Sequence, residues 1–205
     1  MTIVGMRTPV AGAAFLFAAF LAVACPPCAE AAVAKQQRGS VYLMRGFINV
    51  FSTGMNTLND ELRAKGVNST VLGDADWETI AHAIEARYAK DKQNALPVII
   101  MGHSLGANST ELIADELNEK HIPVALIVNF DAVSQMAIPA NVQHVMNFYA
   151  PDGFGLVLKP GPGFHGRLDN INAQKLIPDV QHITIEKQER LHVRVIAEVL
   201  RLLGK

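Results

Sequence analysis

Residues 102–106, Gly-His-Ser-Leu-Gly, place a hydroxyl between two residues that lack side chains. The segment follows the apolar run LPVIIM (96–101) and precedes a helical pattern that carries Leu112, Ile113 and Leu117. Glycines leave room where a strand and a helix crowd together, and a helix start offers N–H groups that have no partner in the helix. If Gly and Ser each make up about 7% of residues, the pattern G-x-S-x-G would occur by chance in roughly 7% of chains of this length. The pattern therefore indicates that Ser104 is a nucleophile rather than part of an ordinary turn.

A serine hydroxyl is a weak nucleophile at neutral pH, so it needs a base within hydrogen-bond reach and a group that orients this base. In its strand–corner–helix context, the motif resembles the nucleophile elbow of the α/β-hydrolase superfamily, in particular that of small lipases and esterases. The resemblance covers roughly residues 40–203. It implies that an acidic residue and then a histidine follow the serine along the chain.

Two histidines are candidates for the base. His182 follows the last expected strand and precedes a turn and the closing helix, which is similar to the usual histidine loop of the family. His192 lies inside the closing helix on the same face as Ile196 and Val199, a position typical of a packed residue. We expect His182 to be the base, with His192 as the alternative. His103 adjoins the serine, but neighbours at a sharp corner point apart, so we do not expect it to be the base.

Two aspartates are candidates for the acid that orients the base. Asp131 ends the wholly apolar run ALIVNF, where a carboxylate needs a polar partner that an imidazole N–H can supply. Asp152 follows the next expected strand, which is the commoner position in the family, but Pro-Asp-Gly is also strong turn chemistry. We expect Asp131 to be the acid and keep Asp152 as the alternative.

The resemblance also implies two backbone donors for the oxyanion of an acyl-transfer reaction. One is the N–H of the residue after the serine, Leu105. The other comes from the loop Arg45-Gly46-Phe47, where we assign the Phe47 N–H, with Gly46 as the alternative. Many relatives have His-Gly where this chain has Arg-Gly, a difference of little chemical weight because the donor is backbone.

Elements that could position these groups alternate along the chain. Apolar runs predict strands at 40–44, 67–72, 96–101, 123–130, 142–149 and 169–176, and helical patterns fall between them and at the end. This alternation predicts an α/β fold with a mostly parallel central sheet covered by helices on both faces. We expect no cap domain, so that the acyl pocket takes its walls from the Gly- and Pro-rich segment 151–167, above all from Phe154, Leu156 and Phe164.

The first 34 residues predict a signal peptide. One Arg precedes an apolar run of about 15 residues, which is short of the roughly 20 needed to span a bilayer. Ala32-Val33-Ala34 fits the A-x-A rule and predicts cleavage before Lys35, which leaves a single domain at 35–205. The alternative is a lipoprotein anchored at Cys25, because the residues before it loosely resemble a lipobox. We expect an exported protein, periplasmic or secreted.

These features together predict a hydrolase of carboxylic esters or thioesters that works through an acyl-enzyme on Ser104. A net charge of -1 argues against nucleic acid as a partner. No metal or nucleotide motif appears in the sequence, so we expect no cofactor and no metal. We expect a small-molecule or lipid acyl ester as substrate and no stable membrane insertion after signal cleavage. A non-catalytic binding protein on the same scaffold and an acyltransferase remain the alternatives.

Overall fold

The computed structural model describes residues 1–2, 37–47 and 52–205. The predicted signal peptide and Cys25 lie outside the described residues, so these predictions stay predictions. The chain divides into two compact units, Met1–Lys35 and Gln36–Lys205, and all the elements described below belong to the second. Among the described residues, no helix combines the length and the apolar character needed to cross a membrane.

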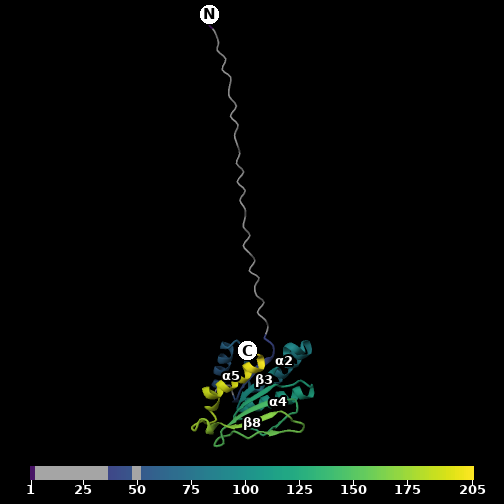
Figure 1. Cartoon of the computed structure of the whole chain (residues 1–205), viewed down its shortest axis with the longest axis vertical. Coiled ribbons are helices and arrows are strands. Elements are labelled where there is room, and N and C mark those ends of the chain that lie inside the picture. Colours follow the sequence, from purple (N-terminus) through teal and green to yellow (C-terminus); the bar gives the residue numbers. More distant parts are fainter. Residues whose placement is uncertain (3–36, 48–51) are drawn as a thin grey trace. The chain divides into compact units, whose positions relative to one another are not determined.

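The second unit is built on a six-stranded sheet with the strand order β2-β1-β3-β4-β6-β8. Figure 1 labels β3 and β8 of this sheet together with the helices α2, α4 and α5. Every neighbouring pair in this sheet is parallel. The strands are β1 (Ser40–Arg45), β2 (Ser69–Gly73), β3 (Val98–His103), β4 (Leu126–Phe130), β6 (His144–Tyr149) and β8 (Arg167–Asn172). A separate two-stranded ribbon pairs β5 (Ala137–Ile138) with β7 (Lys159–Pro160).

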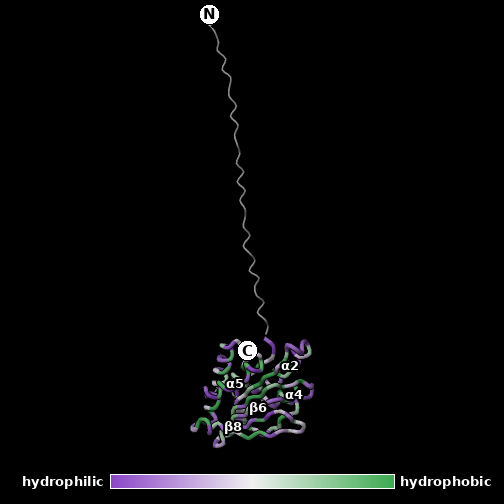
Figure 2. Tube along the Cα trace, in the orientation of Figure 1, coloured by the Kyte–Doolittle hydropathy of each residue, from purple (hydrophilic) through white to green (hydrophobic). Residues whose placement is uncertain are grey.

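Helices cover both faces of the sheet, as the alternating pattern predicted. The helices are α1 (Thr53–Ala64), α2 (Trp77–Lys90), α3 (Lys92–Ala95), α4 (Leu105–Glu119) and α5 (Glu189–Leu203). Successive side chains of the strands enter opposite core clusters: Ile99 and Met101 pack with α1 and α5, whereas Val98 and Ile100 pack with α2 and α4. Figure 2 shows hydrophobic stretches along the strands and a mixture of hydrophobic and hydrophilic residues along α5.

The last strand begins and ends earlier than predicted. It runs from Arg167 to Asn172, and a short 3-10 helix, Ala173–Lys175, occupies the end of the predicted segment 169–176. The side chain of Asn172 accepts hydrogen bonds from the backbone N–H groups of Gln174 and Lys175, which starts the helical turn and ends the strand. Further 3-10 turns lie at Asp74–Asp76 and Ile185–Lys187. Within the described residues, the connection from β6 to β8 carries only the ribbon strand β7, so no cap domain is inserted there.

The order of the strands determines where a ligand can bind. From β1 the chain moves outward to β2, returns to β3, and then continues in the other direction through β4, β6 and β8. Ligands on sheets of this kind bind at the carboxyl ends of the strands where the order reverses, which here is between β1 and β3. Ser104 directly follows β3, and the Gly46–Phe47 segment directly follows β1.

A buried acid in α4 stabilises the fold only while it is protonated. Glu111 is 1% exposed, its Oε1 accepts from the Asn129 amide at 3.0 Å, and its Oε2 has no hydrogen-bond partner. Burial raises the pKa of Glu111 to about 8. Between the ordinary pKa near 4.5 and about pH 8, the folded state therefore holds a proton that the unfolded state has released. Folding stability from this residue is complete below pH 4.5 and is lost as the pH rises.

We expect Glu111→Gln to remove this pH dependence. The uncharged amide keeps the shape of the side chain, so the variant should match wild type at pH 5 and exceed it at pH 9, by roughly 3–5 kcal/mol in unfolding free energy. Urea unfolding at the two pH values measures the difference. Glu119→Gln, an exposed position of the same helix, is the control and should shift neither value. Equal pH slopes for wild type and Glu111→Gln would contradict the assignment.

Candidate active site

Ser104 forms a strained corner between β3 and α4. Its φ of 59° and ψ of −123° lie in a region that residues with a Cβ rarely adopt. A hydrogen bond from the Ser104 N–H to the Phe130 carbonyl (3.0 Å) holds the corner against β4. A Cβ on Gly102 would lie 2.1 Å from the Gly106 carbonyl oxygen, and one on Gly106 would lie 2.5 Å from the Met44 carbonyl oxygen. Both glycines are therefore required by close backbone approach.

Three of the predicted site residues meet at this corner. His182 Nε2 lies 3.0 Å from Ser104 Oγ, and His182 Nδ1 lies 2.7 Å from Asp131 Oδ2. Because a carboxylate only accepts, the Nδ1–H donates to Asp131, and Nε2 is free to accept the proton of the serine hydroxyl. Ser104 is partly exposed and the Asp131 side chain is fully buried, so substrate can reach the hydroxyl while the acid stays shielded from water.

The structure brings Asp131, and not Asp152, to the histidine. Asp131 directly follows β4 at a φ of 56°. Its second oxygen, Oδ1, accepts the Ala150 N–H at 2.6 Å, so both carboxylate oxygens have partners. Asp152 lies exposed in the turn after β6 and lines an open cleft beside His182.

Gly155 packs directly against the acid. A Cβ at this position would lie 1.7 Å from Asp131 Oδ1, the oxygen that accepts the Ala150 N–H. A Cβ on the nearby Gly153 would lie at ordinary contact distances, 3.5 Å from the Ala150 carbonyl oxygen and 3.6 Å from Asp131 Oδ2. The chain after β6 therefore covers the carboxylate so closely that only glycine fits at position 155.

We expect Gly155→Ala to displace the Asp131 carboxylate and lower kcat by about 10²-fold, the scale of a 1 Å misplacement in an active site. Gly153→Ala is the matched control, because its methyl group fits without movement, and it should stay within about twofold of wild type. Ester hydrolysis and thermal unfolding, measured on both variants, separate a displaced acid from an unfolded protein. Equal kcat values for the two folded variants would show that the contact at Gly155 does not matter.

His192 is buried in the first turn of the closing helix α5, and its ring nitrogens contact groups other than the serine. Its Nδ1 lies 2.8 Å from Glu61 Oε2, and its Nε2 lies 2.7 Å from the Glu186 carbonyl oxygen. Both ring nitrogens are therefore engaged, Nδ1 with a side chain of α1 and Nε2 with the 3-10 turn at Ile185–Lys187. This is the packing position that the helical pattern suggested for His192.

The backbone donors around Ser104 are not equivalent. Leu105 is the first residue of α4, so its N–H has no partner within the helix. The Gly46 N–H donates to Ser52 Oγ at 2.9 Å, and the next N–H of this loop that the structure describes is that of Phe47. The N–H of Gly46, the alternative oxyanion donor, thus already has a hydrogen-bond partner. Phe47 lines the same small cavity as Ser104.

Two hollows share the His182 side chain. A cavity of about 110 Å³ lies at Ser104, lined also by Phe47, Ser52, His103 and Ile183. A larger open cleft of about 500 Å³ also borders His182 and is lined by residues 152–154, 178–183 and Gln174. Phe154 stands at this cleft, with its ring edge-on to His182 at 5.1 Å between ring centroids.

Phe154 thus lines the cleft and not the cavity at Ser104, and the other two residues expected to form the acyl pocket line neither hollow. Phe164 packs against the core cluster on the α2 and α4 face, so its assignment to the acyl pocket is wrong. Leu156 is partly buried and is held by backbone hydrogen bonds to Ala132 and to the Asn147 side chain. Between these two residues the chain forms β7, which pairs with β5.

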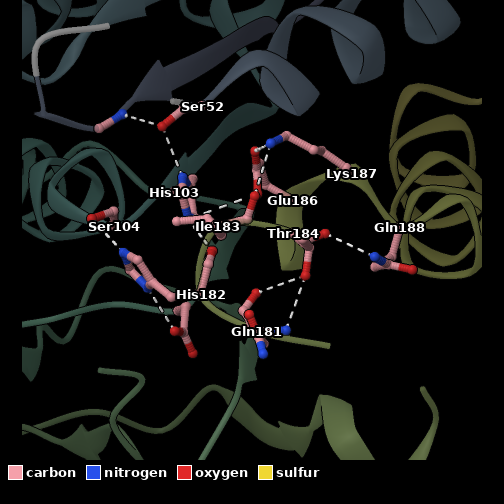
Figure 3. A network of polar contacts seen from close by, with 12 residues as sticks. Ser52, His103, Ser104, Gln181, His182, Ile183, Thr184, Glu186, Lys187 and Gln188 are labelled. Carbon is pink, nitrogen blue, oxygen red and sulfur yellow. Dashed lines mark hydrogen bonds and ion pairs between the residues drawn. The ribbon is translucent and has the colours of Figure 1, made fainter. Parts of the chain in front are cut away.

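Sequence reasoning did not find two groups that shape the site. Ser52 lies buried beside His103, with 2.8 Å between Ser52 Oγ and His103 Nδ1, and this contact spans 51 residues (Figure 3). No motif in the sequence around Ser52 predicts this contact. Gly155 stands in a segment rich in Gly and Pro, and nothing in its sequence context separates it from its neighbours.

No family model matches the chain, and no curated protein matches it. Among solved structures, the chain is similar to a protein from Xanthomonas campestris pv. campestris that is assigned to the hydrolases of the alpha/beta superfamily. The two share 16% sequence identity with a TM-score of 0.50, over 80% of this chain and 99% of the other. This likeness, together with the parallel six-stranded sheet, shows that the chain has an α/β-hydrolase-like fold.

Proposed function

We propose that this protein is a serine hydrolase that cleaves carboxylic esters or thioesters through an acyl-enzyme on Ser104. The observation that carries the proposal is the hydrogen-bonded series Ser104 Oγ–His182–Asp131, with separations of 3.0 and 2.7 Å. The strained corner and the fully buried acid support it, because both are arrangements that folding stability alone does not favour.

The arrangement can carry out acyl transfer in two half-reactions. Ser104 Oγ attacks the carbonyl carbon while His182 Nε2 takes the hydroxyl proton, and the carbonyl oxygen becomes an oxyanion. His182 then gives this proton to the leaving alcohol or thiol, the bond to the leaving group breaks, and the acyl group stays on Ser104. Water, deprotonated by His182, attacks the acyl-enzyme in the same way and releases the acid. Asp131 holds the Nδ1–H throughout and stabilises the imidazolium.

The oxyanion is stabilised by backbone N–H groups in this proposal. Leu105 contributes the free N–H at the start of α4, where the helix dipole also favours negative charge. Phe47 contributes the second N–H, since the neighbouring Gly46 N–H is engaged by Ser52. Because these N–H groups are held in place before the reaction, they do not have to move as negative charge develops on the carbonyl oxygen.

The cavity at Ser104 favours short acyl groups. Its volume of about 110 Å³ holds roughly four groups of water size, at about 30 Å³ each. The cleft of about 500 Å³ adjoins His182, which protonates the leaving group, so it is the larger space for the alcohol or thiol. We propose small-molecule esters with acyl chains of about two to four carbons as substrates.

A chain-length series of p-nitrophenyl esters tests the proposal. We expect kcat/KM to be highest from acetate to butyrate and to fall by at least about tenfold at decanoate, since several methylenes would lose their burial. Labelling with a fluorophosphonate, followed by peptide mapping, should place the adduct on Ser104. A protein that neither hydrolyses any member of the series nor reacts with the probe would be a binding protein on this scaffold.

We also propose that the protein is exported and that residues 1–34 are removed. The proposal rests on the charged start, the apolar run and the A-x-A site of the sequence. N-terminal sequencing of the protein recovered from a bacterial host should begin at Lys35. A lipid-modified N-terminus at Cys25 would instead support the lipoprotein alternative.

A further inference from the structure

A buried row of polar groups joins the two loops on either side of Ser104. The Gly46 N–H lies 2.9 Å from Ser52 Oγ, which lies 2.8 Å from His103 Nδ1. On the other side of the ring, His103 Nε2 lies 2.9 Å from the carbonyl oxygen of His182 (Figure 3). Ser52 and His103 are each 2% exposed. The row thus runs from the loop after β1, through the end of β3, to the residue that carries the catalytic base.

Each hydrogen bond in this row has one possible direction. A carbonyl oxygen only accepts, so His103 Nε2 carries a hydrogen and donates to His182. Burial lowers the pKa of His103 to about 4, so the ring is neutral at pH 7 and has a single N–H. Nδ1 must therefore accept, and its donor is the Ser52 hydroxyl. Ser52 Oγ in turn accepts the Gly46 N–H, so every member of the row is satisfied.

Other groups around the ring do not change this pattern. Glu186 is fully buried, and its Oε2 lies 3.9 Å from His103 Nε2, which is beyond hydrogen-bond length. Burial raises the pKa of the Glu186 carboxyl, and the Lys187 Nζ lies 3.6 Å from its Oε1, the oxygen that does not face the ring. The His103 and His182 rings lie 4.9 Å apart between centroids, tilted by 39°.

The two ends of the row are groups that the proposed reaction needs. Gly46 precedes Phe47, so the bond to Ser52 fixes the backbone just before the proposed oxyanion donor. At the other end, His103 fixes the backbone of His182, whose side chain is the proposed base. Since His103 also precedes Ser104 in the chain, one ring ties the base and the oxyanion loop to the nucleophile.

We propose that His103 is a positioning residue. Its ring accepts a hydrogen bond from Ser52 and donates one to the His182 carbonyl oxygen, and these two bonds hold the oxyanion loop and the base in place relative to Ser104. The inference rests on the proposed hydrolase function for its catalytic consequence. It goes beyond that function because it assigns His103 and Ser52 the role of positioning the groups that react.

Two substitutions each keep one half of the row. In His103→Asn, the side-chain oxygen reaches the place of Nδ1 and can accept from Ser52, but the donor to His182 is lost. In His103→Gln, the longer amide reaches the place of Nε2 and can donate to His182, but the acceptor for Ser52 is lost. We expect each variant to lower kcat by about 10- to 100-fold with little change in KM, because correct geometry matters most in the transition state.

Adding Ser52→Ala to each variant shows whether the row acts as a unit. In wild type and in His103→Asn, losing Ser52 should lower kcat by about tenfold or more. In His103→Gln, where the link from Ser52 to the ring is already broken, the additional loss should be no more than about threefold. The same loss in both backgrounds, or His103 variants with wild-type kcat, would overturn the proposal.

Gln188→Met is the control for general loosening of the histidine loop. It removes a hydrogen bond from Gln188 Nε2 to the Thr184 carbonyl oxygen (2.9 Å), two residues from His182. We expect its kcat to stay within about twofold of wild type, as for a position outside the row. Thermal unfolding of all variants excludes loss of folded protein as the cause of lower kcat.

A measurement that needs no activity separates failure of this inference from failure of the proposed function. Ring ¹⁵N shifts at pH 7 should show His103 protonated at Nε2 and not at Nδ1. The ring signals of His182 should move in His103→Asn and remain near their wild-type positions in His103→Gln. A wild-type protein without hydrolase activity would contradict the proposed function alone. A proton on Nδ1 of His103 would contradict the proposed positioning role of His103.

Discussion

Replacing Ser104 by Ala is expected to lower kcat for a short-chain ester by about 10⁶-fold, since removing a catalytic serine costs on this scale in a serine hydrolase. Alanine keeps a Cβ at the strained corner, so the backbone conformation changes little. His182 would lose the hydroxyl from which it takes a proton, and no acyl-enzyme could form. Residual hydrolysis would come from binding and the oxyanion donors alone. Steady-state kinetics with p-nitrophenyl acetate measures the loss.

Ser134→Ala serves as the control for this experiment, because Ser134 is exposed and its side chain has no part in the site. It should hydrolyse the ester and react with a fluorophosphonate as wild type does. Hydrolysis that persists undiminished in folded Ser104→Ala would mean that the activity belongs to another residue.

The second large effect is expected for Asp131→Asn, about 10⁴-fold in kcat. Position 131 must accept the Ala150 N–H through Oδ1, so an asparagine would place its oxygen there and turn its NH₂ group toward His182 Nδ1. Nδ1 would then have to accept, the ring proton would move to Nε2, and His182 could no longer take a proton from Ser104. The geometry survives in this variant while the tautomer is wrong.

Asp152→Asn tests the alternative acid, and it removes the same single negative charge as Asp131→Asn. Because Asp152 is exposed and forms no hydrogen bond with His182, the kcat of Asp152→Asn should remain within about twofold of wild type. If Asp152→Asn lost most of its activity and Asp131→Asn did not, Asp131 would be a structural residue. The orientation of His182 would then need another explanation.

Local sequence predicted the parts of the fold and the site that depend on nearby residues. The corner at 102–106 follows from two glycines after an apolar strand, and the structure gives each glycine a backbone contact that excludes a Cβ. The apolar run before Asp131 indicated a carboxylate that needs a partner, and His182 lies at that position. Parallel order and two covered faces followed from the alternation of strand and helix patterns.

What the sequence could not predict depends on contacts between distant segments. Phe154 and Phe164 both stand in the 151–167 segment, but only the folded chain shows that the first lies against His182 and the second packs on the α2 and α4 face. The Ser52–His103 contact depends on the path of the loop after β1, and the Gly155 contact depends on how the chain crosses β4. The strand boundary at Asn172 was missed because a side-chain cap, rather than hydrophobicity, ends the strand.

The backbone at Ser104 has a consequence for any attempt to make this protein more heat-resistant. A non-glycine residue at this φ and ψ costs on the order of 1–3 kcal/mol, which a glycine would largely recover. Libraries screened for thermal tolerance alone would therefore enrich glycine at position 104 and yield robust but inert clones. Each round of such a screen needs an activity assay as well, because the residue that gives the highest thermal stability at this position differs from the residue that the proposed reaction requires.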